Sequence, residues 1–195
     1  MGKFIKALLF VLMIVLAIQG ALTGMQTTEK ILYPLAYENY INKYSREYNL
    51  NPYLVMGVIR TESDFVSDAY SDYAGGLMQL TEETAAWNAE KLGIEVYDFM
   101  DPETNIMLGC HYLRYLIDNY SGVVNTALAA YNGGMGNVSE WLENPEYSDD
   151  GKTLKFIPFP ETRGYVLKVN EAMAHYRDNI ESIRAVNALN ENTNN

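Results

Sequence analysis

One glutamate interrupts an otherwise apolar helix face and is the leading candidate for a catalytic group. Counting in helical steps of four, Leu54 and Val58 lead to Glu62, where another hydrophobic residue would be expected. Burial disfavours a charged carboxylate and raises its pKa, which is the direction that a general acid working at neutral pH requires. The alternative is a helix-end glutamate paired with Arg60 or a nearby amide, and the periodicity alone leaves both interpretations open.

Two short segments carry groups that suit a sugar ligand. Adjacent glycines open the segment 75–80, where backbone can approach a ligand, and Gln79 would direct an amide toward the space near the acid. The segment 129–134 combines small residues with Tyr131 and Asn132. Amides supply hydrogen bonds to N-acetyl groups, and an aromatic ring supplies a stacking face for a sugar. Each segment also has an ordinary alternative, because Tyr131 could be a core residue and double glycines could form a simple turn.

Helical spacing dominates the segments that must position these groups. Residues 36–48 carry apolar and tyrosine side chains at helical intervals. Three further helix starts carry a capping side chain, and two of them place proline at the first helical position. These starts are Asn51-Pro52, Thr81 and Asp101-Pro102.

The second half of the chain is also predicted to be helical. The alanine-rich segment 127–131 predicts a short helix ended by two glycines, and a long final helix begins near Glu161. Cys110 lies on the apolar stripe of a helix and is interpreted as a small core residue rather than a nucleophile. Strand signals are weak, with at most an extended segment at 153–159.

The chain is predicted to divide into an N-terminal segment, one domain and a polar tail, over residues 1–28, 29–185 and 186–195. The first segment has no acidic residue, and Lys3 and Lys6 precede a long apolar run, as in an export signal. Because the lysines hold the start in the cytoplasm, the domain is predicted to reach the cell envelope, outside the cytoplasmic membrane. A cleaved signal and a retained anchor both stay open, since the apolar run almost reaches a membrane-spanning length. A buried core helix is disfavoured, because it would show a polar face.

Composition limits the class of protein. The chain has 195 residues, 48% hydrophobic and 20% charged, so it can bury a core without a disulfide or a metal. A net charge of -11 argues against nucleic acid as a partner, because few cations would neutralise phosphates. With one cysteine and two histidines away from ligand spacing, no metal or cofactor is predicted. Asp64, Asp68 and Asp72 lack the ligand pattern and central glycine of a calcium loop.

Four segments occur in an order that is specific as a set. They are residues 59–65 (IRTESDF), 76–79 (GLMQ), 129–134 (AAYNGG) and 160–166 (PETRGYV). Together they resemble the soluble lytic transglycosylase family, over roughly residues 33–175. The resemblance implies a mainly α, lysozyme-like (goose-type) helical domain with a substrate groove, preceded here by the N-terminal hydrophobic helix. It also implies an enzyme, a lyase that cleaves the MurNAc–GlcNAc β-1,4 bond of peptidoglycan without water and leaves a 1,6-anhydro-MurNAc end.

The resemblance assigns roles to individual positions. Glu62 is implied to be the single catalytic residue, acting first as acid and then as base, with Tyr131 close to it, while Asn105 is implied to be structural. The positions implied to bind substrate are Ser71, Met78, Gln79, Tyr131, Asn132, Glu161 and Tyr165. The expected partners are therefore peptidoglycan glycan strands, with the membrane contacted through the N-terminal segment and the protein a monomer.

Two other functions stay open from the sequence. A goose-type-like muramidase would use water and a second acid such as Asp72, as hydrolysing glycosidases usually do. A non-catalytic peptidoglycan-binding protein would keep the groove without turnover, although such a protein would most readily lose the acid. A transglycosylase needs only one carboxyl group, because the C6 hydroxyl of the substrate, already held in place, replaces the water.

Overall fold

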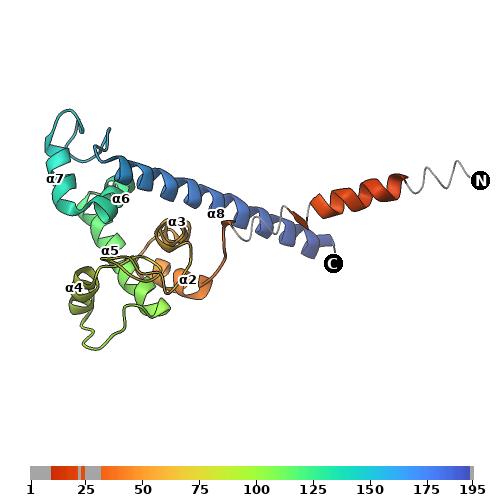
Figure 1. Cartoon of the computed structure of the whole chain (residues 1–195), viewed down its shortest axis with the longest axis horizontal. Coiled ribbons are helices and arrows are strands. Elements are labelled where there is room, and N and C mark those ends of the chain that lie inside the picture. Colours follow the sequence, from red (N-terminus) through yellow and green to blue (C-terminus); the bar gives the residue numbers. More distant parts are fainter. Residues whose placement is uncertain (1–9, 22, 25–31, 194–195) are drawn as a thin grey trace, which may run out of the picture. The chain divides into compact units, whose positions relative to one another are not determined.

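The computed structural model describes residues 10–21, 23–24 and 32–193, with side chains as far as residue 182 (Figure 1). The chain divides into two compact units, Met1–Ala36 and Tyr37–Asn195. The boundary therefore lies at residue 36, a little beyond the end predicted for the N-terminal segment. Lys3 and Lys6, on which the export prediction depends, lie outside the described residues.

In the first unit, residues 10–21 form a helix. Its large apolar side chains are exposed, among them Phe10 and Met13. Within the described part of the chain, no helix combines the length and the apolar character that a membrane crossing needs.

The second unit is built from helices joined by turns (Figure 1). The helices are α2 (Glu38–Glu47), α3 (Pro52–Ser63), α4 (Glu82–Leu92), α5 (Pro102–Asn119), α6 (Val124–Gly133), α7 (Met135–Glu143) and α8 (Pro160–Thr193). Among the described residues, β structure is limited to isolated bridges, two of them around Gly75 and one between Ser148 and Leu154. The mainly α architecture predicted from the sequence is confirmed.

Helices α3, α4 and α5 begin directly after the three capping residues predicted from the sequence. The Asn51 side chain accepts a hydrogen bond from the Tyr53 amide at 2.9 Å, and Thr81 accepts one from Thr84 at 3.0 Å. The Asp101 carboxylate accepts a bond from the Thr104 amide at 3.0 Å. These side chains satisfy amides that have no partner within their own helix.

Two helix boundaries and one whole helix differ from the sequence-based prediction. Helix α6 begins at Val124, earlier than predicted, and α7 was not predicted at all. Gly134, with φ of 84°, separates the two helices, so α7 starts where the sequence indicated only a helix end. Helix α8 continues to Thr193, through the segment predicted to be a polar tail.

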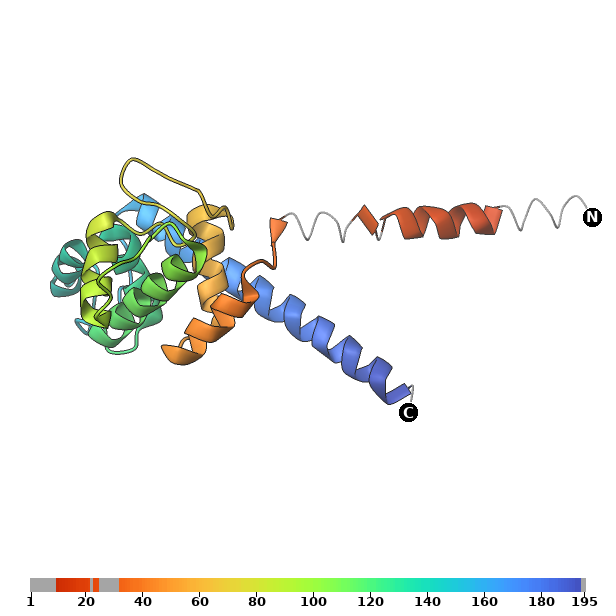
Figure 2. The ribbon, with the colours of Figure 1, turned by 90° about the horizontal axis from the view of Figure 1, so that it is seen from below.

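The core lies where α3 packs against α8 and α5 packs against α6, an arrangement visible for α3 and α8 in Figure 2. The α3 face of Leu54 and Val58 is buried, as its spacing predicted. Gly57 allows the close approach of α3 to α8, because a Cβ there would lie 2.7 Å from the Val169 carbonyl oxygen. Cys110 is fully buried in α5 and is a core residue, as predicted.

Candidate active site

Glu62 lies in the last turn of α3 with a half-buried side chain. Burial raises the pKa of its carboxyl group to about 7, and the nearby Tyr165 hydroxyl opposes that rise only in part. Arg60, the alternative partner considered from the sequence, forms an ion pair with Asp64 at 2.8 Å. The helix ends directly afterwards, because Asp64 and Phe65 adopt left-handed backbone conformations. The acid therefore sits at a helix end, in surroundings that keep it protonated to near neutral pH.

Two tyrosines from different helices flank this acid. Tyr131 of α6 and Tyr165 of α8 stack with ring centroids 6.5 Å apart and planes inclined by 6°. Burial, followed by the charge of the Glu62 carboxylate, raises the pKa of both hydroxyls. Both hydroxyls therefore keep their protons at neutral pH and act as hydrogen-bond donors.

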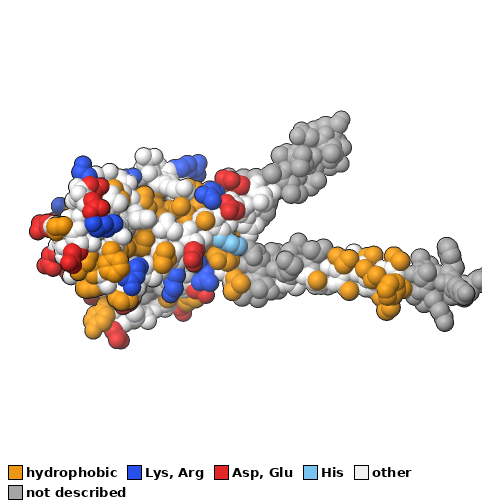
Figure 3. Space-filling model, turned by 90° about the horizontal axis from the view of Figure 1, so that it is seen from above, with side chains coloured by type: hydrophobic (Ala, Val, Ile, Leu, Met, Phe, Trp, Pro, Cys, Tyr) orange, Lys and Arg blue, Asp and Glu red, His pale blue; other side chains and the backbone are white. Residues whose placement is uncertain are grey.

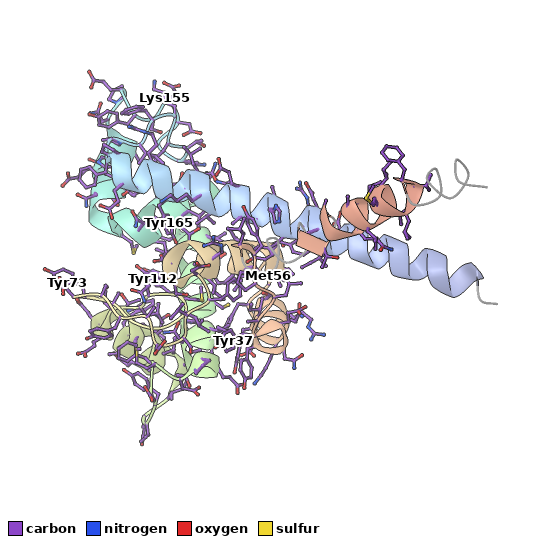
Figure 4. The ribbon with its side chains drawn as sticks, turned by 45° about the vertical axis from the view of Figure 1, so that its right-hand side comes forward. Tyr37, Met56, Tyr73, Tyr112, Lys155 and Tyr165 are labelled. Atoms are coloured by element: carbon purple, nitrogen blue, oxygen red, sulfur yellow. The ribbon has the colours of Figure 1, made fainter. Side chains whose placement is uncertain are left out.

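The two hydroxyls are used differently. The Tyr131 hydroxyl donates to the Met78 carbonyl oxygen at 2.8 Å, so it is already engaged. Tyr165 is 6% exposed. Among the described residues, no group meets both the distance and the angle of a hydrogen bond with its hydroxyl. It lies near enough to lower the pKa of Glu62, so the Glu62 carboxylate is the acceptor within its reach. Tyr165, labelled in Figure 4, can therefore donate a hydrogen bond to the carboxylate of Glu62.

Asn105 fixes the segment that faces the acid. Its side-chain oxygen accepts a hydrogen bond from the Met78 amide at 2.7 Å, and its nitrogen donates to Gly75 and Phe99 carbonyls at 3.1 and 2.7 Å. Asn105 is fully buried, and Gly76 with φ of 78° packs directly against it. The structural role expected for Asn105 is what the structure shows. Gly76 makes room for this packing, while Gly75 makes room for Met100 and Tyr70, and the sequence did not reveal either reason.

Ser63 is a positioning residue that the sequence reasoning missed. Its hydroxyl lies 2.8 Å from the Leu77 carbonyl oxygen and 3.1 Å from that of Ile59. The bond to Leu77 ties the end of α3, one residue after Glu62, to the segment held by Asn105. Its place next to the acid was the available signal, but the partner lies 14 residues away.

Two residues of the GLMQ segment face inward more than predicted. Met78, predicted to bind substrate, is fully buried and packs against Gly109, so its side chain has no surface to offer a ligand. Gln79 is half-buried with φ of 46°, and its amide nitrogen donates to the Ala69 and Gly76 carbonyls, each at 3.0 Å. That nitrogen closes the loop after Glu62, which leaves the amide oxygen for other contacts.

The other predicted substrate-binding residues are on the surface. Ser71 is exposed in a tight turn, where its hydroxyl oxygen accepts a bond from the Ala74 amide at 3.1 Å. Asn132 is exposed near the end of α6, and Glu161 is exposed in the first turn of α8. Asp72, the second acid that a muramidase would use, is exposed in the same loop as Ser71.

The aromatic rings continue away from the acid. Tyr112 of α5, labelled in Figure 4, lies 5.5 Å from Tyr131 by ring centroids. Beyond it, Trp87 and Tyr115 complete an aromatic cluster beside a pocket. These rings were not predicted to belong to the site, although Tyr112 and Tyr115 are spaced to share a helix face. On the face shown in Figure 3, acidic and basic side chains are interspersed rather than gathered by sign.

Known proteins resemble this chain in sequence. The family model for the transglycosylase SLT domain matches residues 39–154. The soluble lytic murein transglycosylase of Salmonella typhimurium is 36% identical in an alignment of 151 positions that covers 74% of this chain and 23% of the relative. The membrane-bound lytic murein transglycosylase C of Yersinia pestis is 31% identical in an alignment of 166 positions that covers 70% of this chain and 45% of that protein.

Solved structures show the same fold. The lytic transglycosylase Slt of Pseudomonas aeruginosa, solved as an inactive mutant, superposes with a TM-score of 0.70 and 31% identity, over 78% of this chain and 26% of that one. The 70 kDa soluble lytic transglycosylase of Escherichia coli gives 0.68 and 34%, over 76% and 25%. The chain thus spans about a quarter of the length of these soluble relatives. The fold expected from the four segments is confirmed.

Proposed function

The chain belongs to the transglycosylase SLT domain family, and on that premise we propose that it is a peptidoglycan lytic transglycosylase. It cleaves the MurNAc–GlcNAc β-1,4 bond and forms a 1,6-anhydro-MurNAc end. The observation that carries this proposal is the half-buried Glu62 carboxyl group, whose pKa is raised to about 7. Near pH 7 such a group is populated both as an acid and as a base, and the proposed reaction uses both forms in turn.

The reaction proceeds in two proton transfers through the same side chain. Protonated Glu62 donates its proton to the glycosidic oxygen while the bond from that oxygen to C1 of MurNAc breaks. The N-acetyl group of MurNAc stabilises the positive charge that develops at C1. Ionised Glu62 then accepts the proton of the C6 hydroxyl as the C6 oxygen bonds to C1, which closes the anhydro ring. No water enters the product, and Glu62 ends protonated, as it began.

Tyr165 and Tyr131 have separate tasks in this scheme. The Tyr165 hydroxyl donates a hydrogen bond to Glu62 while Glu62 is ionised. It is available for this contact because it has no other hydrogen-bond partner among the described residues. A hydrogen bond to a charged acceptor is stronger than one to a neutral acceptor, so this contact strengthens after the first proton transfer. Tyr131, fixed by Met78, supports the Tyr165 ring and keeps solvent from one side of the acid.

The remaining assignments concern the ligand and the location. We assign contacts with the glycan strand to the Gln79 oxygen and to the exposed Ser71, Asn132 and Glu161. The protein acts in the cell envelope, on the outer face of the cytoplasmic membrane, and the first unit serves as export signal or anchor. The apolar surface of residues 10–21 supports a role of that kind.

A muramidase is the less favoured reaction on this site. Inverting and retaining glycosidases place a second carboxyl group across the scissile bond from the acid. The candidate for that group, Asp72, is exposed on the loop after Glu62. Glu62 is half-buried whereas Asp72 is exposed, which favours the reaction in which the substrate supplies its own nucleophile.

Product analysis tests the proposal. The full chain is incubated with intact sacculi, and released fragments are analysed by mass spectrometry. We expect anhydro products, each one water lighter than a hydrolysed end, and a loss of at least about 10²–10⁴-fold in rate for Glu62→Gln. Glu82→Gln, an equal charge change at an exposed position of α4, should keep the wild-type rate. Hydrated ends, or a Glu62→Gln variant that clears sacculi at the wild-type rate, would refute the assignment.

A further inference from the structure

A pocket lies at the corner where the chain passes from α2 into α3, two helices drawn in orange in Figure 2. It has a volume of about 420 Å³. The residues that line it are Asn42, Ser45, Arg46, Leu50 and Pro52. Glu62 lies at the other end of α3, ~15 Å along the helix axis from Pro52. The pocket is therefore separate from the surroundings of the acid, and the reaction proposed above uses none of its side chains.

Backbone hydrogen bonds hold the two sides of the pocket together. The Leu50 amide donates to the Ser45 carbonyl at 2.7 Å, and the Asn49 amide donates to the Arg46 carbonyl at 3.3 Å. Asn49 makes this tight turn possible with φ of 50°. Because these bonds form within the chain itself, the pocket is preformed, which lowers the entropic cost of binding.

Ser45 gives the pocket a buried hydroxyl that no described group engages. The residue is 1% exposed, and among the described residues its Oγ has no hydrogen-bond partner. Serine and threonine side chains inside a helix commonly donate to the carbonyl four residues earlier, as Thr61 and Ser63 do in α3. Ser45 does not use that default partner. A buried hydroxyl without a partner is unfavourable, so a ligand atom that accepts its hydrogen would stabilise the site.

Arg46 gives the pocket a positive charge. Its Nε donates to the Asn42 carbonyl at 3.0 Å, which fixes the side chain along α2. It forms no ion pair with another residue in the described part of the chain. The adjacent acid, Glu47, faces Tyr48 instead, since burial and then the charge of Glu47 raise the pKa of the Tyr48 hydroxyl. The terminal nitrogens of Arg46 are thus available to an anionic ligand.

These donors fit a single carboxylate. Its two oxygens can accept from a guanidinium and from a hydroxyl at once, and the Asn42 amide on the same wall is a further donor. Among the described residues that line the pocket, Arg46 carries the one formal charge, which matches a monoanion better than a doubly charged phosphate. Leu50 and Pro52 add apolar surface for a small aliphatic group next to the carboxylate.

We propose that this pocket binds the terminal carboxylate of a short peptide whose last residue is small and aliphatic. The carboxylate accepts hydrogen bonds from Arg46 and Ser45, and the aliphatic side chain packs against Leu50 and Pro52. Because Glu62 lies at the other end of α3, the peptide end occupies the pocket without contact with the acid. The proposal goes beyond the reaction proposed above and does not depend on it.

Binding of N-acetyl-D-alanyl-D-alanine to the full chain tests the pocket, and calorimetric titration gives the affinity. Saturable binding is expected. The C-terminal amide of the same peptide should bind at least about tenfold more weakly, because it carries no charge for Arg46. Added salt should weaken binding of the acid form, as it screens an exposed cation. Glycerol 3-phosphate, which supplies a phosphate in place of a carboxylate, should bind more weakly than the peptide.

A pair of charge variants locates the bound carboxylate. Arg46→Gln should weaken binding of the peptide at least about tenfold, to nearly the affinity of the amide. Arg177→Gln removes the same charge from an exposed position of α8 that does not line the pocket, and it should leave the affinity within about twofold.

A pair of serine variants separates binding from folding. Ser45→Ala should weaken binding of the peptide about fivefold, because one donor to the carboxylate is lost. It should not lower the midpoint of urea unfolding, since the hydroxyl has no partner among the described residues. Ser63→Ala makes the same change at a buried serine whose hydroxyl contacts two carbonyl oxygens, so it should lower that midpoint.

Several outcomes would overturn the site. They are absence of saturable peptide binding, equal affinity for the peptide and its amide, unchanged affinity in Arg46→Gln, and tighter binding of glycerol 3-phosphate than of the peptide. A Ser45→Ala variant that loses as much stability as Ser63→Ala, with unchanged affinity, would assign the hydroxyl to the fold instead. Peptide binding is measured without glycan, so its result is independent of the products released from sacculi.

Discussion

Replacing Glu62 by glutamine should stabilise the folded protein at alkaline pH. The environment of Glu62 favours the neutral acid, because burial raises its pKa from 4.5 to about 7. Above that pH the folded protein holds a carboxylate where its surroundings disfavour charge. Glutamine has nearly the same shape and never ionises, so it removes this cost while it removes the acid.

The magnitude follows from the pKa difference between the folded and unfolded states. Each pKa unit corresponds to about 1.4 kcal/mol, so the full rise is equivalent to about 3 kcal/mol. Between pH 4.5 and 7 the folded state binds the proton more tightly than the unfolded state does, so stability falls as pH rises through this window. Below pH 4.5 both states are protonated and the contribution of Glu62 is fully favourable. The variant should therefore gain up to about 3 kcal/mol over wild type at pH 8, relative to the difference at pH 4.

Urea unfolding of both proteins at pH 4, 6 and 8 measures this difference. Other titrating groups affect wild type and variant alike, so they cancel in the comparison. Glu82→Gln, at an exposed position of α4, serves as the control and should show no such pH-dependent gain. If the stability difference between Glu62→Gln and wild type stayed constant from pH 4 to pH 8, the acid would not have a raised pKa and the reasoning would fail.

Two further variants test the contact of Tyr165 with Glu62 and the hydrogen bonds made by Asn105. Tyr165→Phe removes the hydroxyl that lowers the pKa of Glu62, so the alkaline limb of the pH–rate profile should move up by about one unit and the maximal rate should fall, whereas an unmoved limb would exclude contact with the acid. Asn105→Ala leaves one amide and two carbonyls in the fully buried segment without partners, and should cost about 3–5 kcal/mol in urea unfolding. Asn119→Ala, exposed at the end of the same helix, should cost less than about 0.5 kcal/mol. Equal losses in the two asparagine variants would contradict the structural role of Asn105.

The acid and its helix were predictable because their signals are local. Capping by Asn51 and the four-residue spacing that ends at Glu62 depend on neighbours along one helix, and both proved correct. The stacking of Tyr131 on Tyr165 joins helices that are distant in the sequence, and no periodicity reports it. The same limit applies to Ser63, whose identity was visible but whose partner is supplied by a turn 14 residues later.

Helix α7 was missed for a different reason. A glycine with positive φ marks the end of a helix, but it does not say how soon another helix begins. Here Gly134 ends α6 and directly precedes Met135, so one residue serves both helices. The glycines at 75 and 76 were misread in a similar way, since a requirement for space does not say what fills it. In this protein Asn105 fills the space at Gly76, while Met100 and Tyr70 lie against Gly75.

Hydrogen bonds from three separate helices converge on Leu77 and Met78: Ser63 reaches from α3, Asn105 from α5 and Tyr131 from α6. If these helices were undocked, we expect that Glu62 would be solvated and that its pKa would return toward the usual range. The raised pKa of Glu62 is thus a property of the assembled domain rather than of one segment. We therefore expect the raised pKa of Glu62 to be lost in the same transition that unfolds the helices.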